Sequence, residues 1–258
     1  MITGASAGIG EAFAGVFAAE GFDVVLVARR EERLRALADR LTKEHGVTAH
    51  VIVADLAERD ASARIVSELT AAGVQVDALV NNAGYGVPGT YRRSPWERHD
   101  ATLQVMVTAV AELTYRLLPG MIERGYGRIV NVASVAGLIP AFAGHTLYSA
   151  TKAFVIKFSE SLGHEVRAKG VYVLALCPGF TYSEFHDVTG TREQMNNTPS
   201  WLWFDAETVA RQGYDAVMAG VPLYINGRVY RAITLFVKYS PQWLIKAIER
   251  RLGHRKLD

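Results

Sequence analysis

Short apolar runs alternate with amphipathic helical segments along most of this chain. The run 23–28 (DVVLVA) is almost wholly apolar, as expected of a parallel strand that helices cover on both faces. Runs of the same kind predict further strands at 48–54, 76–80, 127–132, 171–177 and 223–226. Helical periodicity predicts helices at 9–20, 31–45, 61–72, 94–125, 147–169 and 205–219. The alternation predicts an α/β protein with a doubly wound parallel sheet, the three-layer Rossmann fold, in a single domain over 1–258.

A glycine-rich turn, TGASAGIG at residues 3–10, opens the chain. Gly4, Gly8 and Gly10 permit a tight turn and let a pyrophosphate approach backbone N–H groups closely, and the helix that follows points its positive end at the phosphates. A strand of about five residues normally precedes such a turn, but only Met1 and Ile2 precede it here. The sequence therefore predicts either a first strand that is cut short or a true start further upstream. It favours a true start upstream, because a missing central strand leaves its neighbours unpaired.

Two arginines follow the strand at 23–28. Ala28 occupies the position where an acidic residue would hold the ribose hydroxyls of NAD. Arg29 and Arg30 suit the 2′-phosphate of NADP instead, because guanidinium groups pair well with phosphate oxygens. Without the glycine turn, these arginines would be interpreted as solvated charge at the start of a helix. With the turn, they favour NADP (NADPH) over NAD as the cofactor.

Polar turns follow the next two strands as well. Asp55 and Leu56 come directly after the strand at 48–54. A carboxylate there can meet an adenine amino group or cap the helix that begins near Glu58, and the sequence leaves both roles open. Residues 81–84, NNAG, end the strand at 76–80, and on their own they are ordinary turn chemistry.

A serine, a tyrosine and a lysine between residues 134 and 152 can act as one catalytic unit. Tyr148 and Lys152 are four residues apart, so on a helix they lie on the same face. A lysine ammonium one turn away is expected to lower the pKa of the tyrosine, which is ordinarily near 10. Ser134 lies where a strand ends, and its hydroxyl can donate to a carbonyl oxygen that Tyr148 protonates. The chemistry indicated is proton transfer to an oxygen while another group delivers a hydride.

Two segments near the C-terminus fall outside the alternation. Residues 180–204 have no clear period and are predicted to form a lid over a substrate site, although their aromatic residues can simply pack the loop down. Residues 228–258 are predicted to form a C-terminal helical extension. A basic amphipathic end can lie on an anionic membrane surface, but packing on the domain, lining the substrate mouth or joining subunits is commoner. The apolar face of this extension comprises Leu244, Ile245, Ile248 and Leu252, and the aromatic residues of the lid are Phe180, Phe185, Trp201, Trp203 and Phe204.

Composition limits the partners and the compartment. A net charge of +2, without a concentrated basic stripe before the C-terminus, argues against nucleic acid as a partner. Cys177 is the single cysteine and lies in an apolar run, so we expect a buried thiol, no internal disulfide and a reducing environment. From the sequence we expect that no apolar run is long enough to span a membrane and that no signal peptide is present. A cytoplasmic location is therefore expected.

Taken together, the motifs resemble those of the short-chain dehydrogenases/reductases, over residues 1–227. The PGFT run at 178–181 and the helical tail are similar to a bacterial branch of oxidoreductases within that family. Five motifs occur in the family's order and spacing: TGASAGIG at 3–10, NNAG at 81–84, Ser134, YSATK at 148–152 and Pro178-Gly179.

The resemblance implies a role for each of these residues. Tyr148 would be the general acid/base, Lys152 would lower its pKa and hold the nicotinamide ribose, and Ser134 would orient the substrate carbonyl. No metal ion is implied. The implied cofactor contacts are the glycine turn (Gly4, Ser6, Ala7, Gly8, Ile9, Gly10) on the diphosphate, Arg29 on the 2′-phosphate with Arg30 also in the site, Asp55 and Leu56 at the adenine, Asn82, Ala83 and Gly84 beside the adenine and ribose, and Pro178, Gly179 and Thr181 at the nicotinamide, with Ser183 where the family often has threonine.

One position departs from the family pattern. Members commonly carry an asparagine in the fourth helix that holds a water in a proton relay from the lysine, and Met106 stands at that position here. A thioether cannot donate a hydrogen bond and accepts one only weakly. We therefore expect activity with slower proton exchange or a different water path.

The leading hypothesis is an NADP-dependent oxidoreductase that acts on a carbonyl or secondary alcohol of an apolar substrate. The aromatic residues at 180–204 modestly favour a lipid-like, acyl or ring-containing ketone over a sugar. The alternative is a cofactor-binding redox sensor or scaffold without turnover, for which Met106 is the one supporting feature. The resemblance also implies a homodimer or homotetramer, assembled through the fourth and fifth helices.

Overall fold

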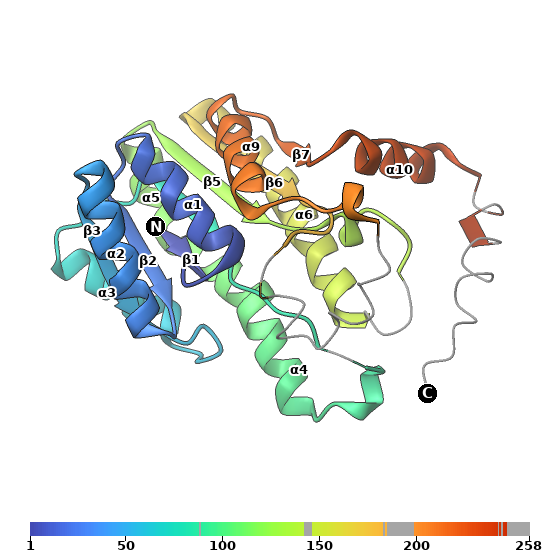
Figure 1. Cartoon of the computed structure of the whole chain (residues 1–258), viewed down its shortest axis with the longest axis horizontal. Coiled ribbons are helices and arrows are strands. Elements are labelled where there is room, and N and C mark those ends of the chain that lie inside the picture. Colours follow the sequence, from blue (N-terminus) through green and yellow to red (C-terminus); the bar gives the residue numbers. More distant parts are fainter. Residues whose placement is uncertain are drawn as a thin grey trace.

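Seven parallel strands form one sheet, in the order β3-β2-β1-β4-β5-β6-β7 (Figure 1). The structure is a computed structural model that describes residues 1–87, 89–141, 146–182, 184, 199–241, 243 and 245–246. The strands are β1 (Ile2–Thr3), β2 (Val24–Ala28), β3 (Ala49–Val53), β4 (Ala78–Asn81), β5 (Gly127–Val132), β6 (Val171–Cys177) and β7 (Leu223–Ile225). The helices are α1 (Gly8–Ala19), α2 (Glu31–His45), α3 (Ala61–Ala71), α4 (Trp96–Leu103), α5 (Ala109–Glu123), α6 (Thr146–Val166), α9 (Ala206–Met218) and α10 (Arg228–Tyr239). The predicted doubly wound Rossmann fold is confirmed.

Helices cover both faces of the sheet because strand side chains alternate between two apolar cores. Val24 and Leu26 of β2 pack with residues of α1, α2 and α9 on one face. Val25 and Val27 of the same strand pack with residues of α3, α5 and α6 on the other. A strand buried on both sides needs apolar residues at nearly every position, which is why β2 reads as a continuous apolar run.

The first strand is short, as the sequence predicts. β1 has two residues, and Ile2 pairs with Leu26 of β2 and with Val80 of β4. β1 and β4 are neighbours in the sheet although β2 and β3 lie between them in the sequence. The chain therefore reverses its direction of travel across the sheet at this place, and open α/β sheets bind their ligands at such a switch point.

The helical stretch predicted at 94–125 is interrupted by a turn of π-helix, Gln104–Thr108, between α4 and α5. By length and composition, Trp96–Glu123 is apolar enough to cross a membrane, so the expectation that no apolar run reaches that length is wrong. Val105, Met106 and Leu113 from this stretch lie in the core beneath the sheet. Core helices of globular proteins pass the same test of length and composition, because an apolar face is what packs them on a sheet.

A buried polar network joins the middle of the sheet to the helices behind it. Asn81 Nδ2 donates to Asn131 Oδ1 at 2.8 Å and to Thr114 Oγ1 at 3.2 Å, and Asn131 Nδ2 donates to Ser159 Oγ at 2.9 Å. These bonds connect β4 and β5 with α5 and α6. The first asparagine of NNAG is therefore a structural residue that holds the turn at the end of β4 in place.

α10 packs through Tyr230 on the segment that follows β6. The Tyr230 hydroxyl accepts from Phe180 N at 3.1 Å and donates to Leu202 O at 2.9 Å. Most of the predicted lid, 183 and 185–198, and most of the predicted apolar face of the tail lie outside the described residues. The extension that the structure does describe begins with a helix at Arg228, where the predicted boundary lies.

Candidate active site

The glycine turn and the NNAG turn are bound to each other at the switch point. Thr3 Oγ1 accepts from Asn82 N at 2.9 Å and from Ala83 N at 3.1 Å, and Asn82 Nδ2 donates to Thr3 O at 3.0 Å. Thr3 Oγ1 also donates to Val80 O at 3.2 Å. These bonds hold the ends of β1 and β4 rigidly together. Gly84, at the end of the NNAG turn, extends the resulting surface to Met106 in the helical stretch.

Close backbone approach explains the glycines of the turn. Gly4 and Gly8 have positive φ values of 67° and 58°, which L-residues with a side chain rarely adopt. A Cβ on Gly10 would lie 2.3 Å from Gly4 O. The turn leads directly into α1, whose first N–H groups have no partner within the helix. These residues fit a dinucleotide phosphate, because a narrow turn at a helix N-terminus offers backbone donors and a partial positive charge.

Arg30, rather than Arg29, lies against the glycine turn. Its Nε and Nη2 donate to Ser6 Oγ at 3.1 and 3.0 Å. Arg29 Nη1 lies 3.6 Å from Asp55 Oδ2; Arg29 is exposed and Asp55 is partly buried. Asp55 Oδ1 also accepts from Ala57 N at 3.0 Å, a bond within the turn after β3 that leaves Oδ2 facing the arginine. The alternative in which Asp55 caps the next helix is wrong, because α3 begins at Ala61 with Asp60 at its N-cap. The two arginines therefore flank the predicted adenosine end of the site from two sides.

The structure brings Ser134, Tyr148 and Lys152 together. Ser134 is buried at the end of β5, where its Oγ accepts from Ala136 N at 3.1 Å, and a side-chain hydrogen bond joins it to Tyr148. Lys152 Nζ donates to Val132 O at 2.7 Å and lies 5.7 Å from the centroid of the Tyr148 ring. The strand end and the helix α6 thus supply one cluster with a hydroxyl, a phenol and an amine.

The pKa of Tyr148 moves in the opposite direction to the one predicted. Burial of the hydroxyl raises its pKa above the ordinary value, and the hydrogen bond with Ser134 lowers it by a smaller amount. Burial also lowers the pKa of the Lys152 ammonium to about 8, with the nearby Cys177 opposing that shift. The expectation that Lys152 lowers the tyrosine pKa is therefore wrong for the protein without cofactor, because desolvation disfavours both charged forms.

The raised pKa of Tyr148 predicts a measurable pH dependence of its ionisation. A group that is neutral when protonated and has a raised pKa stays protonated to a higher pH. We expect the phenolate absorbance of the cofactor-free protein, measured as wild type minus Tyr148→Phe, to stay near zero until the pH exceeds about 10. A phenolate that appears in this difference spectrum at about pH 7 to 9 would show that Lys152 dominates instead.

The end of β6 carries the remaining predicted cofactor residues. A Cβ on Gly179 would lie 2.1 Å from the Tyr230 ring, so only glycine allows α10 to pack there. Thr181 Oγ1 donates to Gly179 O at 3.2 Å, and Thr181 pairs with Phe204 in an isolated parallel bridge. Pro178 O accepts from Val135 N at 3.1 Å, which fixes this segment beside Ser134. Cys177, just before it, is fully buried, and burial raises the pKa of its thiol to about 12, so the predicted buried thiol is confirmed.

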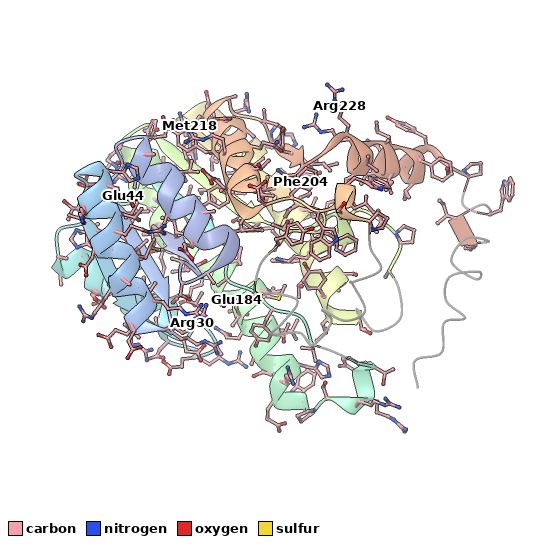
Figure 2. The ribbon with its side chains drawn as sticks, in the orientation of Figure 1. Arg30, Glu44, Glu184, Phe204, Met218 and Arg228 are labelled. Atoms are coloured by element: carbon pink, nitrogen blue, oxygen red, sulfur yellow. The ribbon has the colours of Figure 1, made fainter. Side chains whose placement is uncertain are left out.

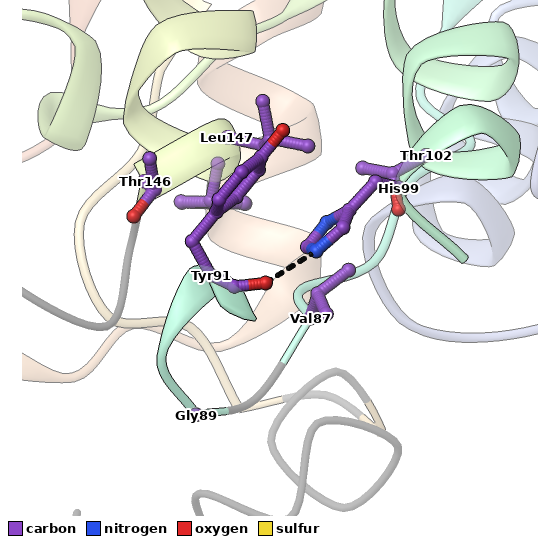
Figure 3. Close-up of a pocket in the computed structure, with 8 residues that line it drawn as sticks. Val87, Gly89, Tyr91, His99, Thr102, Thr146 and Leu147 are labelled. Carbon is purple, nitrogen blue, oxygen red and sulfur yellow. Dashed lines mark hydrogen bonds between the residues drawn. The ribbon is translucent and has the colours of Figure 1, made fainter. Parts of the chain in front are cut away.

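Tyr148 lines a small pocket of about 20 Å³. Figure 3 shows His99 and Tyr91 in the wall of this pocket. His99 in its wall is buried, stacks on the Tyr91 ring at 4.5 Å between centroids, and places Nε2 2.8 Å from Tyr91 O. Within the described part of the chain, His99 Nδ1 has no hydrogen-bond partner. Sequence reasoning missed His99, because a single histidine in a helical pattern carries no signal that it borders a tyrosine almost fifty residues away. The pocket is lined by Val87, Gly89, Tyr91, His99, Thr102, Thr146, Leu147 and Tyr148.

Met106 lies in the π-helical turn and is almost fully buried. A Cβ on Gly84 would be 3.6 Å from Met106 Cε, so the thioether packs on the end of the NNAG turn. The Met106 side chain therefore packs against the predicted cofactor-binding surface and supplies no hydrogen-bond donor there.

Comparison with known proteins gives one consistent result. Residues 1–194 match the short chain dehydrogenase family. The chain is 39% identical over 253 residues to an uncharacterized oxidoreductase of Myxococcus xanthus, covering 98% of this chain and 96% of the relative. Among solved structures, a short-chain dehydrogenase from Sphingobium yanoikuyae in complex with NADPH aligns with a TM-score of 0.81 at 32% identity, covering 95% of this chain and 94% of that one. The bulky-bulky ketone specific alcohol dehydrogenase from Comamonas testosteroni aligns with a TM-score of 0.78 at 30% identity, covering 99% and 93%.

Proposed function

Since this chain belongs to the short-chain dehydrogenase/reductase family and is an NAD(P)-dependent oxidoreductase, we propose that it reduces an apolar ketone with NADPH and oxidises the matching secondary alcohol in reverse. The observation that carries the proposal is the Ser134–Tyr148 hydrogen bond, with Lys152 one helical turn away. The sensor or scaffold alternative is disfavoured, because this cluster is assembled and Met106 replaces none of its members.

Each residue of the cluster has a defined task. When bound, the reduced nicotinamide supplies a hydride to the carbonyl carbon. The Ser134 hydroxyl donates to the carbonyl oxygen, and the Tyr148 hydroxyl transfers its proton to that oxygen as negative charge develops there. A raised pKa keeps Tyr148 protonated at neutral pH, the form that reduction requires. Lys152 would replace that proton and donate to the nicotinamide ribose, and its bond to Val132 O supports this role by fixing its side chain beside Tyr148.

Aromatic side chains that follow Pro178-Gly179 in the chain support an apolar substrate. Trp203 stacks on Phe180 at 5.4 Å and on Tyr182 at 4.7 Å between ring centroids. Such rings offer a large apolar surface with few fixed hydrogen-bond donors, which suits a bulky ketone better than a polyol. The similarity to a bulky-bulky ketone specific alcohol dehydrogenase supports the same substrate class.

The cofactor preference rests on Arg30 and Arg29. Arg30 contacts Ser6 in the glycine turn, and no acidic residue occupies position 28, where Ala28 ends β2. Two guanidinium groups at the adenosine end favour an additional phosphate. The NADPH complex of the Sphingobium yanoikuyae structure supports this choice.

A turnover assay tests the proposal. Consumption of NADPH and of NADH would be followed by the absorbance of the reduced nicotinamide, with a panel of aryl, alkyl and cyclic ketones and a matched panel of sugars and short polar aldehydes. We expect NADPH-dependent turnover of one or more of the apolar ketones. Turnover confined to the polar substrates, or equal rates with both cofactors, would contradict the substrate class or the cofactor preference respectively.

A second proposal concerns α10, whose outward face is apolar and basic. Val229, Ile233, Leu235, Phe236 and Tyr239 are exposed on this helix, whereas Tyr230 and Thr234 are buried. All charged residues of α10 (Arg228, Arg231 and Lys238) are basic. An apolar stripe flanked by cations complements an anionic lipid surface, and we propose that α10 lies on one.

Co-sedimentation with lipid vesicles tests whether α10 binds an anionic membrane surface. Wild-type protein should pellet with phosphatidylserine-containing vesicles and less with neutral phosphatidylcholine vesicles, because the basic residues add attraction to anionic headgroups. Replacing both Ile233 and Phe236 with glutamate should leave the protein in the supernatant with its ketone turnover retained. If wild type does not pellet but is a dimer that the double variant splits, α10 joins subunits and the membrane proposal is wrong.

A further inference from the structure

Glu184 occupies the space between two arginines at the adenosine end of the site. Its Oε2 accepts from Arg30 Nη1 at 2.7 Å, and its Oε1 accepts from Arg33 Nη1 at 2.5 Å. Figure 2 shows the side chains of Arg30 and Glu184 meeting, although 154 residues separate them in the chain. The carboxylate therefore comes from the segment after β6, and both guanidinium groups come from the start of α2.

The same arginine touches the glycine turn with its other edge. Arg30 Nε and Nη2 donate to Ser6 Oγ while Nη1 reaches Glu184, so one guanidinium links the turn to the carboxylate. Arg33, one turn further along α2, adds a second positive charge. Arg30 and Arg33 form an anion cradle beside Ser6, and the anion that fills it in the cofactor-free chain is a carboxylate of the protein itself.

A phosphate monoester fits this cradle better than a carboxylate does. It carries a charge of about −1.5 to −2 at neutral pH and has three acceptor oxygens, against one charge and two oxygens for glutamate. The arginines also hold the pKa of Glu184 below its ordinary value, so the carboxylate is ionised at neutral pH when it fills the cradle. Both groups cannot occupy the cradle together, because two anions a few ångströms apart repel each other.

We propose that Glu184 is a built-in competitor of the NADP 2′-phosphate, and that Arg33 joins Arg30 in binding that phosphate once Glu184 is displaced. This inference rests on the proposed NADP preference and adds two specificity-determining residues to it. NADPH then binds with an affinity reduced by the fraction of molecules in which Glu184 fills the cradle. NADH lacks the phosphate, cannot displace the carboxylate and leaves Glu184 paired with Arg30 and Arg33.

Glu184→Gln provides the test, with NADPH, NADH, adenosine 2′,5′-bisphosphate and 5′-AMP as titrants. The amide keeps the shape and loses the charge, so NADPH and the bisphosphate should bind roughly 3- to 30-fold more tightly, as expected for the loss of two exposed ion pairs. NADH and 5′-AMP should bind as they do to wild type. High salt should narrow the difference between variant and wild type, because these charges are accessible to solvent.

Two further variants sharpen the result. Arg33→Ala should weaken binding of the bisphosphate and leave 5′-AMP unchanged. Glu20→Gln removes a carboxylate that is likewise paired with an arginine, Arg211, at the far end of α1, and should change no affinity. Unchanged or weaker NADPH binding by Glu184→Gln would overturn the inference. Equal wild-type affinities for the bisphosphate and 5′-AMP would instead overturn the proposed NADP preference.

Discussion

Replacing Tyr148 with phenylalanine should lower the rate of ketone reduction by roughly 10²- to 10⁴-fold, the range that a positioned general acid contributes. The change removes one hydroxyl, which is hydrogen-bonded to Ser134 in the wild type, and keeps the ring that packs beside Lys152. Binding of NADPH should therefore remain close to that of the wild type. The measurement is single-turnover oxidation of bound NADPH with saturating ketone, so that binding and chemistry are separated.

The control for this prediction is Tyr115→Phe. Tyr115 is 78% exposed on α5 and lies outside the cluster, so the same loss of a hydroxyl should leave the rate unchanged. If Tyr148→Phe retains more than about a tenth of wild-type turnover, a different group supplies the proton. If it loses NADPH binding as well, the variant has damaged the cofactor site and the rate alone proves nothing about proton transfer.

Replacing Arg30 with alanine should weaken NADPH binding by roughly 10- to 100-fold and change NADH binding little. Hydrogen bonds to charged groups contribute about 1.5–3 kcal/mol each, and the variant loses those that Arg30 would make to the 2′-phosphate. Arg29→Ala should act in the same direction with a smaller effect, because Arg29 lies against Asp55 rather than against the glycine turn. Parallel equilibrium titrations with both cofactors measure the ratio.

Arg35→Ala is the matched control on the same helix. Arg35 pairs with Glu31 one turn along α2 and is exposed, so its loss changes the net charge equally without opening the site. A similar drop in NADPH affinity for Arg35→Ala would mean that long-range charge, rather than a contact, sets the preference. Equal losses of NADPH and NADH affinity for Arg30→Ala would show that this arginine does not recognise the 2′-phosphate.

Local patterns were sufficient to predict most helices and strands of the fold, although not the π-helical turn Gln104–Thr108. The apolar runs at 127–132 and 171–177 are strands with those bounds, and the amphipathic run at 31–45 is a helix with those bounds. The spacing of apolar residues and the length of the run indicate a strand or a helix, and both can be read from one segment alone. Gly4 and Gly10 were predictable for the same reason, since the spacing in a short turn is fixed by its geometry.

Contacts between distant segments could not be predicted in this way. Nothing local indicates that Asn81 bonds Asn131, that Tyr230 requires glycine at position 179, or that Glu184 meets Arg30. The pKa of Tyr148 shows the same limit. The helical spacing of Lys152 was interpreted correctly, but the dominant influence is burial, which depends on the whole packed site. Solvation and pairing across the fold are properties of the tertiary structure alone.

The most direct test of the account is an equilibrium titration of the wild-type protein with NADPH and, in parallel, with NADH, followed by the fluorescence of the reduced nicotinamide. It needs no knowledge of the substrate and probes the glycine turn, Ser6 and Arg30 together. We expect both cofactors to bind and NADPH to bind at least about tenfold more tightly, the effect of one charge-assisted contact to the 2′-phosphate. Equal affinities, tighter NADH binding, or no binding of either cofactor would contradict the account.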